Sequence, residues 1–325
     1  MAFPERHWYR FSLLSALLAP AAMAFDAFVR LRRAAYEAGL LRKVRIRVPV
    51  VVVGNLVVGG TGKTPLVLWL AAALVKRGWR PGIVSRGHGA GATHVRAVPV
   101  GGNPHEFGDE PLLHAERSGC PVWIGRDRPA AAAALLAANP ECDVIICDDG
   151  LQHYALARDF EIAVRDERGA GNGLLLPAGP LREPVGRPVD AWVVNGAAAS
   201  PGEFAMRLVS AGFRRVASPD AEVPLAELTG KRLHAVAGIG NPRRFFAQLE
   251  SMGIAAQSHA FPDHHSFRAE ELAFPGCDYI LMTEKDAVKC RAFENDRLLA
   301  LRVNAVVDAR LADQVERRIR GLPAA

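Results

Sequence analysis

Apolar residues in the body of the chain form short runs that are rich in β-branched side chains. The first run, residues 48–53, reads VPVVVV and ends at Gly54 and Asn55. An apolar run of this length without alternation is typical of a parallel strand that is buried on both faces. The same reasoning predicts strands at residues 82–85, 121–124, 143–147, 162–164 and 191–194.

Helical patterns separate some of these runs. Residues 64–76 are predicted to form a helix that Gly78 ends, and residues 128–138 form an alanine-rich helical stretch. Strands that alternate with helices indicate an α/β fold with a doubly wound, mainly parallel sheet.

A second group of strand-like runs follows the small, polar segment 196–202, at residues 233–237, 254–260 and 279–282. A polar segment of small residues is typical of a domain boundary. We therefore predict an N-terminal arm over residues 1–45, an α/β domain over residues 46–195, and a second, smaller α/β domain over residues 196–325.

The N-terminal arm contains an uncharged, mostly apolar segment. Residues 11–25 read FSLLSALLAPAAMAF, 15 residues that Pro20 interrupts and Asp26 follows. Because a membrane-spanning helix needs about 20 apolar residues, the segment is short for one. Arg6 and Arg10 before it, with Ala-Met-Ala at residues 22–24, also fit a signal peptide.

Beyond this segment the arm continues to Tyr36 as a mixture of apolar and basic residues. A helix with apolar side chains on one side and arginines on the other can lie in the lipid headgroup layer. We interpret the arm as a basic, amphipathic, monotopic membrane anchor. An ordinary amphipathic helix packed on the body of the protein is the alternative.

The charge distribution supports this interpretation of the arm. The 325 residues include 40 basic and 34 acidic ones, a net charge of +6. Nine basic and three acidic residues lie at or before Arg47, so the arm and the two residues that follow it account for the whole net charge. Because the body is balanced and has no recognition-helix, zinc-finger or RNA-binding pattern, nucleic acid is not an expected partner.

The five cysteines are scattered and include no CxxC pair. Neither a disulfide framework nor a thiolate zinc site is indicated, and a reducing compartment fits best.

The glycine-rich sequence GGTGKT follows the first predicted strand directly and precedes a helix. This is the context in which backbone N–H groups cradle phosphates, a lysine reaches the β- and γ-phosphates, and a threonine binds Mg²⁺. One departure is Val57, which stands where the standard spacing has a glycine. The predicted nucleotide-binding residues are Gly59, Gly60, Thr61, Gly62, Lys63 and Thr64.

Two carboxylates, Asp148 and Asp149, end the apolar run 143–147. In a P-loop domain such a strand carries the aspartate that holds Mg²⁺. Asp-Asp-Gly is also a common turn sequence, so the metal interpretation depends on the neighbouring glycine-rich loop.

Polar loops supply further candidate groups. Asp109 precedes a helical stretch and fits a helix N-cap, although a loop carboxylate can also activate a hydroxyl group. His264 and His265 follow Asp263 and fit either a metal site or an imidazole that orients a distant carboxylate. Residues 238–242 and 283–286 are predicted strand-to-helix turns at the ligand-binding edge of a sheet.

Together the motifs resemble the tetraacyldisaccharide 4'-kinases of lipid A biosynthesis, whose order they follow from about residue 49 to 289. They are VGN at residues 53–55, GGTGKTP at 59–65, SRG at 85–87, GDEP at 108–111, DDGLQH at 148–153, LPAGPLRE at 176–183, GIGNP at 238–242, FPDHH at 261–265 and TEKD at 283–286.

The resemblance implies a P-loop NTPase-like fold of two α/β/α domains with the active site between them. It implies transfer of the γ-phosphate of ATP, with Mg²⁺, to the 4'-hydroxyl of a tetraacyldisaccharide 1-phosphate. It also implies a location at the cytoplasmic face of the Gram-negative inner membrane, where the N-terminal helix touches anionic lipid. We expect the enzyme to act as a monomer.

Carried onto the matching positions, the resemblance makes Asp109 the base, assisted by His264. Lys63 and Thr64 then serve the phosphates and Mg²⁺, and Asp148 and Asp149 serve the metal. The implied acceptor-binding residues are Ser85, Arg86, Glu110, Arg126, Gln152, His153 and Arg182, with Arg128 as a further phosphate-binding candidate.

The sequence departs from the family pattern in one loop, and two other classes of protein are alternatives. His88 replaces a tyrosine that is usual in the family, and Gly89-Ala90 lacks the expected arginine, so no acceptor contact is inferred for that loop. A membrane-associated P-loop ATPase switch shares the GGTGKT core. Such switches have a lysine before the first glycine, where this chain has Val58. An exported or purely structural membrane protein is a third alternative, which cleavage after Ala24 would support.

Overall fold

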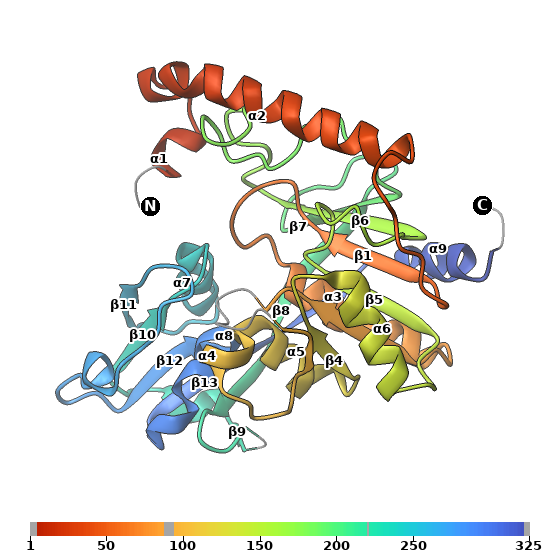
Figure 1. The fold of residues 1–325 in the computed structure, drawn as a ribbon. Coiled ribbons are helices and arrows are strands. Elements are labelled where there is room, and N and C mark those ends of the chain that lie inside the picture. The colour runs from red at the N-terminus through yellow and green to blue at the C-terminus, as the bar shows by residue number, and fades with distance from the viewer. Residues whose placement is uncertain (1–4, 88–93, 220, 322–325) are drawn as a thin grey trace.

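The computed structural model describes residues 5–87, 94–219 and 221–321, and its fold is built on a single 13-stranded sheet (Figure 1). The strands are β1 (Val50–Gly54), β2 (Pro81–Ser85), β3 (Arg96–Ala97), β4 (Val122–Ile124), β5 (Val144–Asp148), β6 (Phe160–Asp166), β7 (Ala191–Asn195), β8 (Phe204–Arg215), β9 (Glu222–Val223), β10 (Leu233–Ala237), β11 (Gln257–Ala260), β12 (Tyr279–Thr283) and β13 (Leu298–Val307).

Helices cover both faces of the sheet. The α-helices are α1 (Glu5–Trp8), α2 (Leu13–Glu37), α3 (Lys63–Lys76), α4 (Pro104–Phe107), α5 (Asp109–Ser118), α6 (Arg128–Ala138), α7 (Pro242–Ser251), α8 (Glu284–Cys290) and α9 (Arg310–Ile319), and short 3-10 turns are η1 (Leu225–Leu228), η2 (Ala269–Leu272) and η3 (Arg291–Phe293).

Strand order explains how the two predicted halves join. The order is β11-β10-β12-β13-β8-β7-β6-β1-β5-β2-β4-β3, with β9 paired to β8. Pairing is parallel except between β8 and β13, β8 and β9, and β3 and β4. The predicted α/β fold with a large, mainly parallel sheet is confirmed. The division at residues 196–202 stays a prediction, because β7 pairs with β8 and the sheet runs through both halves.

Strand β1 shows why a continuous apolar run is needed at the centre of the sheet. Val51 and Val53 pack with α3, α5 and α9 on one face. Val50 and Val52 pack on the other face with α6 and with Leu151. All four valines are buried, which matches the absence of alternation in the sequence.

Strands β8 and β13 were not predicted from the sequence. They form a long antiparallel pair of 12 and 10 residues, and their middle residues are only partly buried, so no continuous apolar run marks them. The pairing shifts between Leu301 and Val303, where Ala211 and Gly212 of β8 lie opposite Arg302. Gly212 has a φ of 83°, which fits the glycine of a β-bulge.

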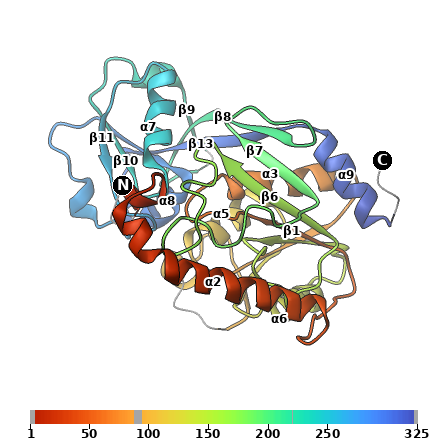
Figure 2. The ribbon, with the colours of Figure 1, turned by 90° about the horizontal axis from the view of Figure 1, so that it is seen from above.

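The predicted N-terminal helix is confirmed as α2, which runs along one side of the molecule (Figures 1 and 2). The helix continues through Pro20, the residue that interrupts the apolar run in the sequence. Trp8 before α2 donates to the carbonyl of Pro177 (3.1 Å), and Arg32 donates to the carbonyl of Gln152 (3.1 Å). These contacts fix the helix to the body.

Most of α2 does not pack on the body, however. The helix is long and apolar enough to cross a membrane by length and composition, although a signal sequence passes the same test. The exposed large apolar side chains of this region are Phe11, Leu13, Leu17, Met23, Phe28 and Leu31. The interpretation as an ordinary packed helix accounts poorly for this surface, because contiguous exposed apolar area marks an interaction site.

Packing of α3 on the sheet generates a stability prediction. Leu70 is fully buried among the residues of the first core, whereas Leu40 is 80% exposed. Leu70→Ala should lower the free energy of unfolding by about 2–5 kcal/mol, because it removes buried methyl groups and leaves a cavity. Leu40→Ala should change it by less than about 0.5 kcal/mol. Urea unfolding followed by circular dichroism measures both, and equal midpoints for the two variants would contradict the assigned core.

Candidate active site

The glycine-rich loop lies between β1 and α3, as predicted. Gly59 and Gly62 have φ values of 100° and 98°, a region that glycine enters without steric cost. Asn55 donates to the carbonyl of Gly59 (3.1 Å) and to the hydroxyl of buried Thr61 (3.2 Å). The loop is thus held open by side chains from outside the motif, and Lys63 and Thr64 start α3.

Asn195, which sequence reasoning did not assign to the site, also supports this loop. It is buried at the end of β7 and donates to the carbonyl of Thr61 (2.9 Å). A side chain at Gly62 would place its Cβ 2.4 Å from the Asn195 amide nitrogen. Arg244 donates to the Asn195 amide oxygen (2.7 Å), which orients the amide. Only the parallel pairing of β6 with β7 brings Asn195 here, so no local motif could reveal it.

The two aspartates at the end of β5 differ in their partners. Asp149 is 3.5 Å from Lys63 Nζ and accepts from Arg182 at 3.1 and 3.2 Å. Burial favours the neutral carboxyl, but Lys63 and Arg182 hold the pKa of Asp149 below its ordinary value. Asp149 is therefore a charged partner of Lys63, the lysine that the sequence predicts to bind phosphates.

Asp148 is buried, and one of its carboxylate oxygens contacts an imidazole and a hydroxyl group. Its Oδ2 lies 3.1 Å from His114 Nε2 and 3.5 Å from the Ser85 hydroxyl. Its Oδ1 is buried and has no hydrogen-bond partner in the part of the chain that the structure describes. A buried carboxylate oxygen without a partner is costly unless a cation or water satisfies it. This atom fits the predicted metal role, whereas Ser85 supports Asp148.

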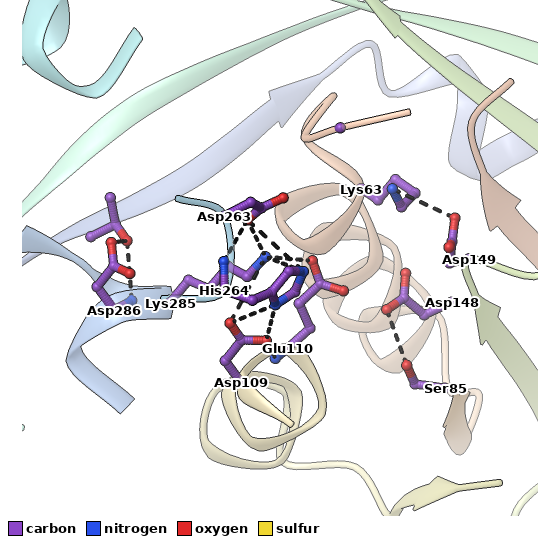
Figure 3. A network of polar contacts seen from close by, with 12 residues as sticks. Lys63, Ser85, Asp109, Glu110, Asp148, Asp149, Asp263, His264, Lys285 and Asp286 are labelled. Carbon is purple, nitrogen blue, oxygen red and sulfur yellow. Dashed lines mark hydrogen bonds and ion pairs between the residues drawn. The ribbon is translucent and has the colours of Figure 1, made fainter. Parts of the chain in front are cut away.

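Asp109 and His264 meet from opposite halves of the chain (Figure 3). His264 Nδ1 is 3.1 and 3.2 Å from the two carboxylate oxygens of Asp109. The interpretation of Asp109 as an N-cap is wrong: α5 begins at Asp109 and its N-cap is Gly108. The side chain of Asp109 is only 2% exposed and turns to the imidazole instead.

The pair has coupled charges. Burial favours protonation of Asp109, but the hydrogen bond from His264 and the charge of Lys285 lower the pKa of this carboxyl below its ordinary value. The hydrogen bond to Asp109 raises the pKa of His264. Asp109 is therefore ionised at neutral pH, as a proton acceptor must be.

The second histidine of the predicted pair points elsewhere. His265 Nε2 is 3.1 Å from Glu271 Oε2. Within residues 5–87, 94–219 and 221–321, no group of three or more His, Cys, Asp or Glu side chains is arranged to hold a metal ion. A metal site at the two histidines is therefore not supported, and the alternative role of orienting a distant carboxylate is the one that His264 adopts.

Lys285 is a charged residue of this cluster that the sequence did not assign. Its position in the first turn of α8 agrees with the predicted strand-to-helix turn, and Thr283 caps the helix by accepting from the Asp286 amide (3.1 Å). The Lys285 ammonium contacts Glu110 at 3.2 Å and Asp263 at 3.4 Å. Carboxylates raise the pKa of Lys285 despite its burial.

Most of the predicted acceptor-binding residues line one cavity of about 500 Å³. Residues Phe25 and Phe28 of α2 lie on its wall. Burial and nearby arginines lower the pKa of His153 to about 4, so its imidazole is neutral at pH 7. The predicted residues that line this cavity are Arg86, Arg126, Arg128, Gln152, His153 and Arg182. Ser85 and Glu110 do not line this cavity. The Ser85 hydroxyl donates to Asp148, and Glu110 accepts a hydrogen bond from Lys285.

Taken with the sheet, this geometry is that of a P-loop kinase, an enzyme that moves a phosphoryl group from a nucleotide to an acceptor. The model of one protein family, described as tetraacyldisaccharide-1-P 4'-kinase, matches residues 14–320. This chain belongs to that family. The predicted activity, that of a tetraacyldisaccharide 4'-kinase in lipid A biosynthesis, is thereby confirmed, and the ATPase-switch alternative is excluded.

Individual relatives carry the same name as the family. The chain is 48% identical over 318 residues to a tetraacyldisaccharide 4'-kinase of Methylobacillus flagellatus, with 97% of this chain and 95% of the relative covered. It is 51% identical over 314 residues to the enzyme of that name from Azoarcus sp. strain BH72, with 93% and 91% covered.

A solved structure shares the fold. The crystal structure of LpxK from Aquifex aeolicus, described as an apo form in complex with ATP, superposes with a TM-score of 0.82. The two chains are 29% identical, and the match covers 94% of this chain and 100% of the other. His88, Gly89 and Ala90, where the sequence departs from the family, lie outside the described residues.

The contact between Asp109 and His264 generates a titration prediction. Asp109→Asn removes the negative charge that raises the pKa of His264, so this pKa should fall to about 6.5 or below. NMR titration of the His264 ring protons measures the change. Glu271→Gln is the matched control, because Glu271 contacts His265 and not His264. An unchanged His264 titration in Asp109→Asn would show that the two side chains do not pair in solution.

Proposed function

We propose that this enzyme transfers the γ-phosphate of ATP to the 4'-hydroxyl of a tetraacyldisaccharide 1-phosphate, with Asp109 as the base. The observation that carries the proposal is the meeting of two polar clusters (Figure 3). Lys63 and Asp149 form one cluster, and Asp109 and His264 form the other. Glu110 lies between them and is influenced by the charges of both Lys63 and Lys285.

The base acts by accepting the proton of the sugar hydroxyl. A hydroxyl group is a poor nucleophile until its proton is taken, and a carboxylate within hydrogen-bonding reach can take it as the new P–O bond forms. His264 donates to Asp109 and keeps it oriented. Because phosphoryl transfer depends mainly on alignment and charge neutralisation, a fixed, ionised carboxylate suffices.

Lys63 and the glycine-rich loop bind the phosphates of the nucleotide. The N-terminus of α3 adds the partial positive charge of its free N–H groups, and the Lys63 ammonium adds a full charge. Asp149 holds this ammonium in the site at 3.5 Å. In this arrangement the lysine is oriented before the nucleotide arrives.

The residues around Asp148 fit Mg²⁺. The metal would be held by the Thr64 hydroxyl, by Asp148 through its unpartnered Oδ1 and by Asp149, and its remaining positions suit phosphate and water oxygens. Bound there, Mg²⁺ neutralises charge that develops on the phosphates.

The 500 Å³ cavity is the proposed acceptor site. Its arginines are suited to a phosphate, because a guanidinium binds phosphate oxygens through two parallel hydrogen bonds. Gln152 and neutral His153 offer groups for sugar hydroxyls, while Phe25 and Phe28 offer an apolar wall from α2. The mixture matches an acylated, phosphorylated sugar. We assign the 1-phosphate to this cavity as a whole.

We further propose that α2 associates with the cytoplasmic face of the inner membrane and acts as a monotopic anchor. Its exposed apolar side chains supply apolar contact with lipid, and the arginines of its second half supply attraction to anionic headgroups. The acyl chains of the acceptor then stay in the lipid phase while its sugar reaches the cavity beside Phe25. The enzyme acts as a monomer.

Phosphate transfer tests the proposal. Purified enzyme in detergent micelles, given γ-labelled ATP, Mg²⁺ and tetraacyldisaccharide 1-phosphate, should label the lipid. Asp109→Ala should lower kcat at least about 100-fold through loss of the base, and Lys63→Ala should lower kcat/KM at least about 100-fold through loss of phosphate stabilisation.

Lys76→Ala is the matched control for this experiment, because Lys76 is an exposed lysine in the last turn of α3. It should retain full activity. Full activity of Asp109→Ala would assign the base to another residue, and full activity of Lys63→Ala would remove the phosphate role from this loop.

Membrane association has its own test. Leu13→Asp combined with Leu17→Asp places two charges on the exposed side of α2, where both leucines are more than three-quarters exposed (92% and 77%). Co-sedimentation with vesicles that contain anionic lipid should fall several-fold, because charged groups lower the apolar contribution to binding. Val100→Asp, at an exposed apolar site away from α2, is the control. Unchanged co-sedimentation of the double variant would refute the anchor.

A further inference from the structure

Lys285 lies close to the proposed base Asp109 and to its neighbours His264 and Glu110. Its ammonium nitrogen lies 3.4 Å from His264 Nε2, 3.9 Å from Asp109 Oδ2 and 3.2 Å from Glu110 Oε1. The side chain is 16% exposed, and it comes from α8, 175 residues after Glu110. Figure 3 shows Lys285 beside His264 and Glu110. The proposed reaction assigns no role to this lysine.

Hydrogen-bonding rules fix the state of the imidazole between these groups. An ammonium has three donors and no acceptor, and an ionised carboxylate only accepts. His264 Nδ1, which faces the Asp109 carboxylate, must therefore carry a hydrogen. His264 Nε2, which faces the Lys285 ammonium, receives a hydrogen bond through its lone pair. Both contacts are satisfied by one species, the neutral imidazole with its proton on Nδ1.

The opposite state is disfavoured by charge. A proton on Nε2 would direct a positively polarised N–H at an ammonium 3.4 Å away. Among the described residues, the charged groups near His264 include Asp109 and Glu110 of α5, Lys285 of α8 and Asp263 of its own loop. The hydrogen bond to Asp109 raises the pKa of His264, and the charge of Lys285 lowers it, so Lys285 is a cation that limits protonation of this ring.

We propose that Lys285 is a positioning residue of the base, which donates to Nε2 of His264 and fixes the neutral imidazole with its proton on Nδ1. This inference rests on the proposed function of Asp109 as the base. An imidazolium at His264 would stabilise the Asp109 carboxylate and weaken it as a proton acceptor. A neutral imidazole keeps Asp109 oriented by a hydrogen bond and adds no second positive charge to that of Lys285, which itself lowers the pKa of Asp109.

The first test reads the imidazole directly. In ¹⁵N NMR spectra of the wild-type enzyme, His264 Nδ1 should show the shift of a protonated ring nitrogen and Nε2 that of an unprotonated one at pH 8. His264→Gln assigns the signals. In Lys285→Met the pKa of His264 should rise by about one unit, because a nearby like charge is removed. A wild-type proton on Nε2, or an unchanged titration in Lys285→Met, would overturn the proposal.

The second test is the pH dependence of kcat/KM. Removing the ammonium raises the pKa values of both Asp109 and His264, so the acidic limb should move up by about one pH unit in Lys285→Met. Lys285→Arg keeps the positive charge, so the acidic limb of its pH profile of kcat/KM should lie where it does in the wild type. A lowered kcat with an unchanged limb would mean that Lys285 only supports the fold, which would overturn the proposal.

Lys289→Met is the matched control, since Lys289 lies one turn later in α8 and pairs with Asp286 at 2.7 Å. It should leave the limb where it is in the wild type, whatever its effect on stability. If Lys285→Met does not fold, the proposal is decided by which ring nitrogen of His264 carries the proton in the wild-type enzyme.

The assignment of Asp109 as the base is tested separately. Full activity of Asp109→Ala would refute that assignment and would leave the NMR result for His264 unaffected.

Discussion

The packing of α5 against α8 is the contact on which the active site depends. Helix α5 carries Asp109 and Glu110, and α8 carries Lys285, yet the two helices are about 170 residues apart in the chain. Arg117 of α5 donates to both carboxylate oxygens of Glu284 at 2.5 and 2.7 Å, and both side chains are only 13% exposed. Glu116 pairs with Arg291 just beyond α8. These ion pairs join the two helices in the register that brings Asp109, Glu110 and Lys285 together.

The other half of the site depends on the edge of the sheet. Strands β1, β5 and β2 are parallel neighbours, so their carboxyl ends bring the phosphate-binding loop, Asp148 and Ser85 together. Asn55 and Asn195 then hold the loop in shape through hydrogen bonds to its backbone. The proposed phosphate site is thus built at one edge of the sheet, whereas the proposed base depends on contacts between α5, α8 and the loop that carries His264.

This difference decides how much of the molecule could be predicted from its sequence. The phosphate-binding loop has a local motif, and the bounds of α6 and β10 match the predicted ones, because their patterns are local too. The role of Asp109 was ambiguous because an aspartate just before a helix fits both an N-cap and the proposed base. Lys285 and Asn195 were missed because their roles arise from contacts between distant segments. The paired strands β8 and β13 were missed because each is partly exposed.

The bulge in β8 has a consequence for motion. The 12-residue strand β8 contacts β7 on one side and β13 on the other, so the two halves of the chain share a strand instead of meeting at a flexible linker. Any change in the separation of His264 from the phosphate-binding loop must therefore twist this ribbon. The ladder of hydrogen bonds between β8 and β13 is interrupted near Gly212, so the ribbon is least constrained at this point. Relative motion of the two halves is therefore resisted by a continuous sheet, unlike rotation about a linker.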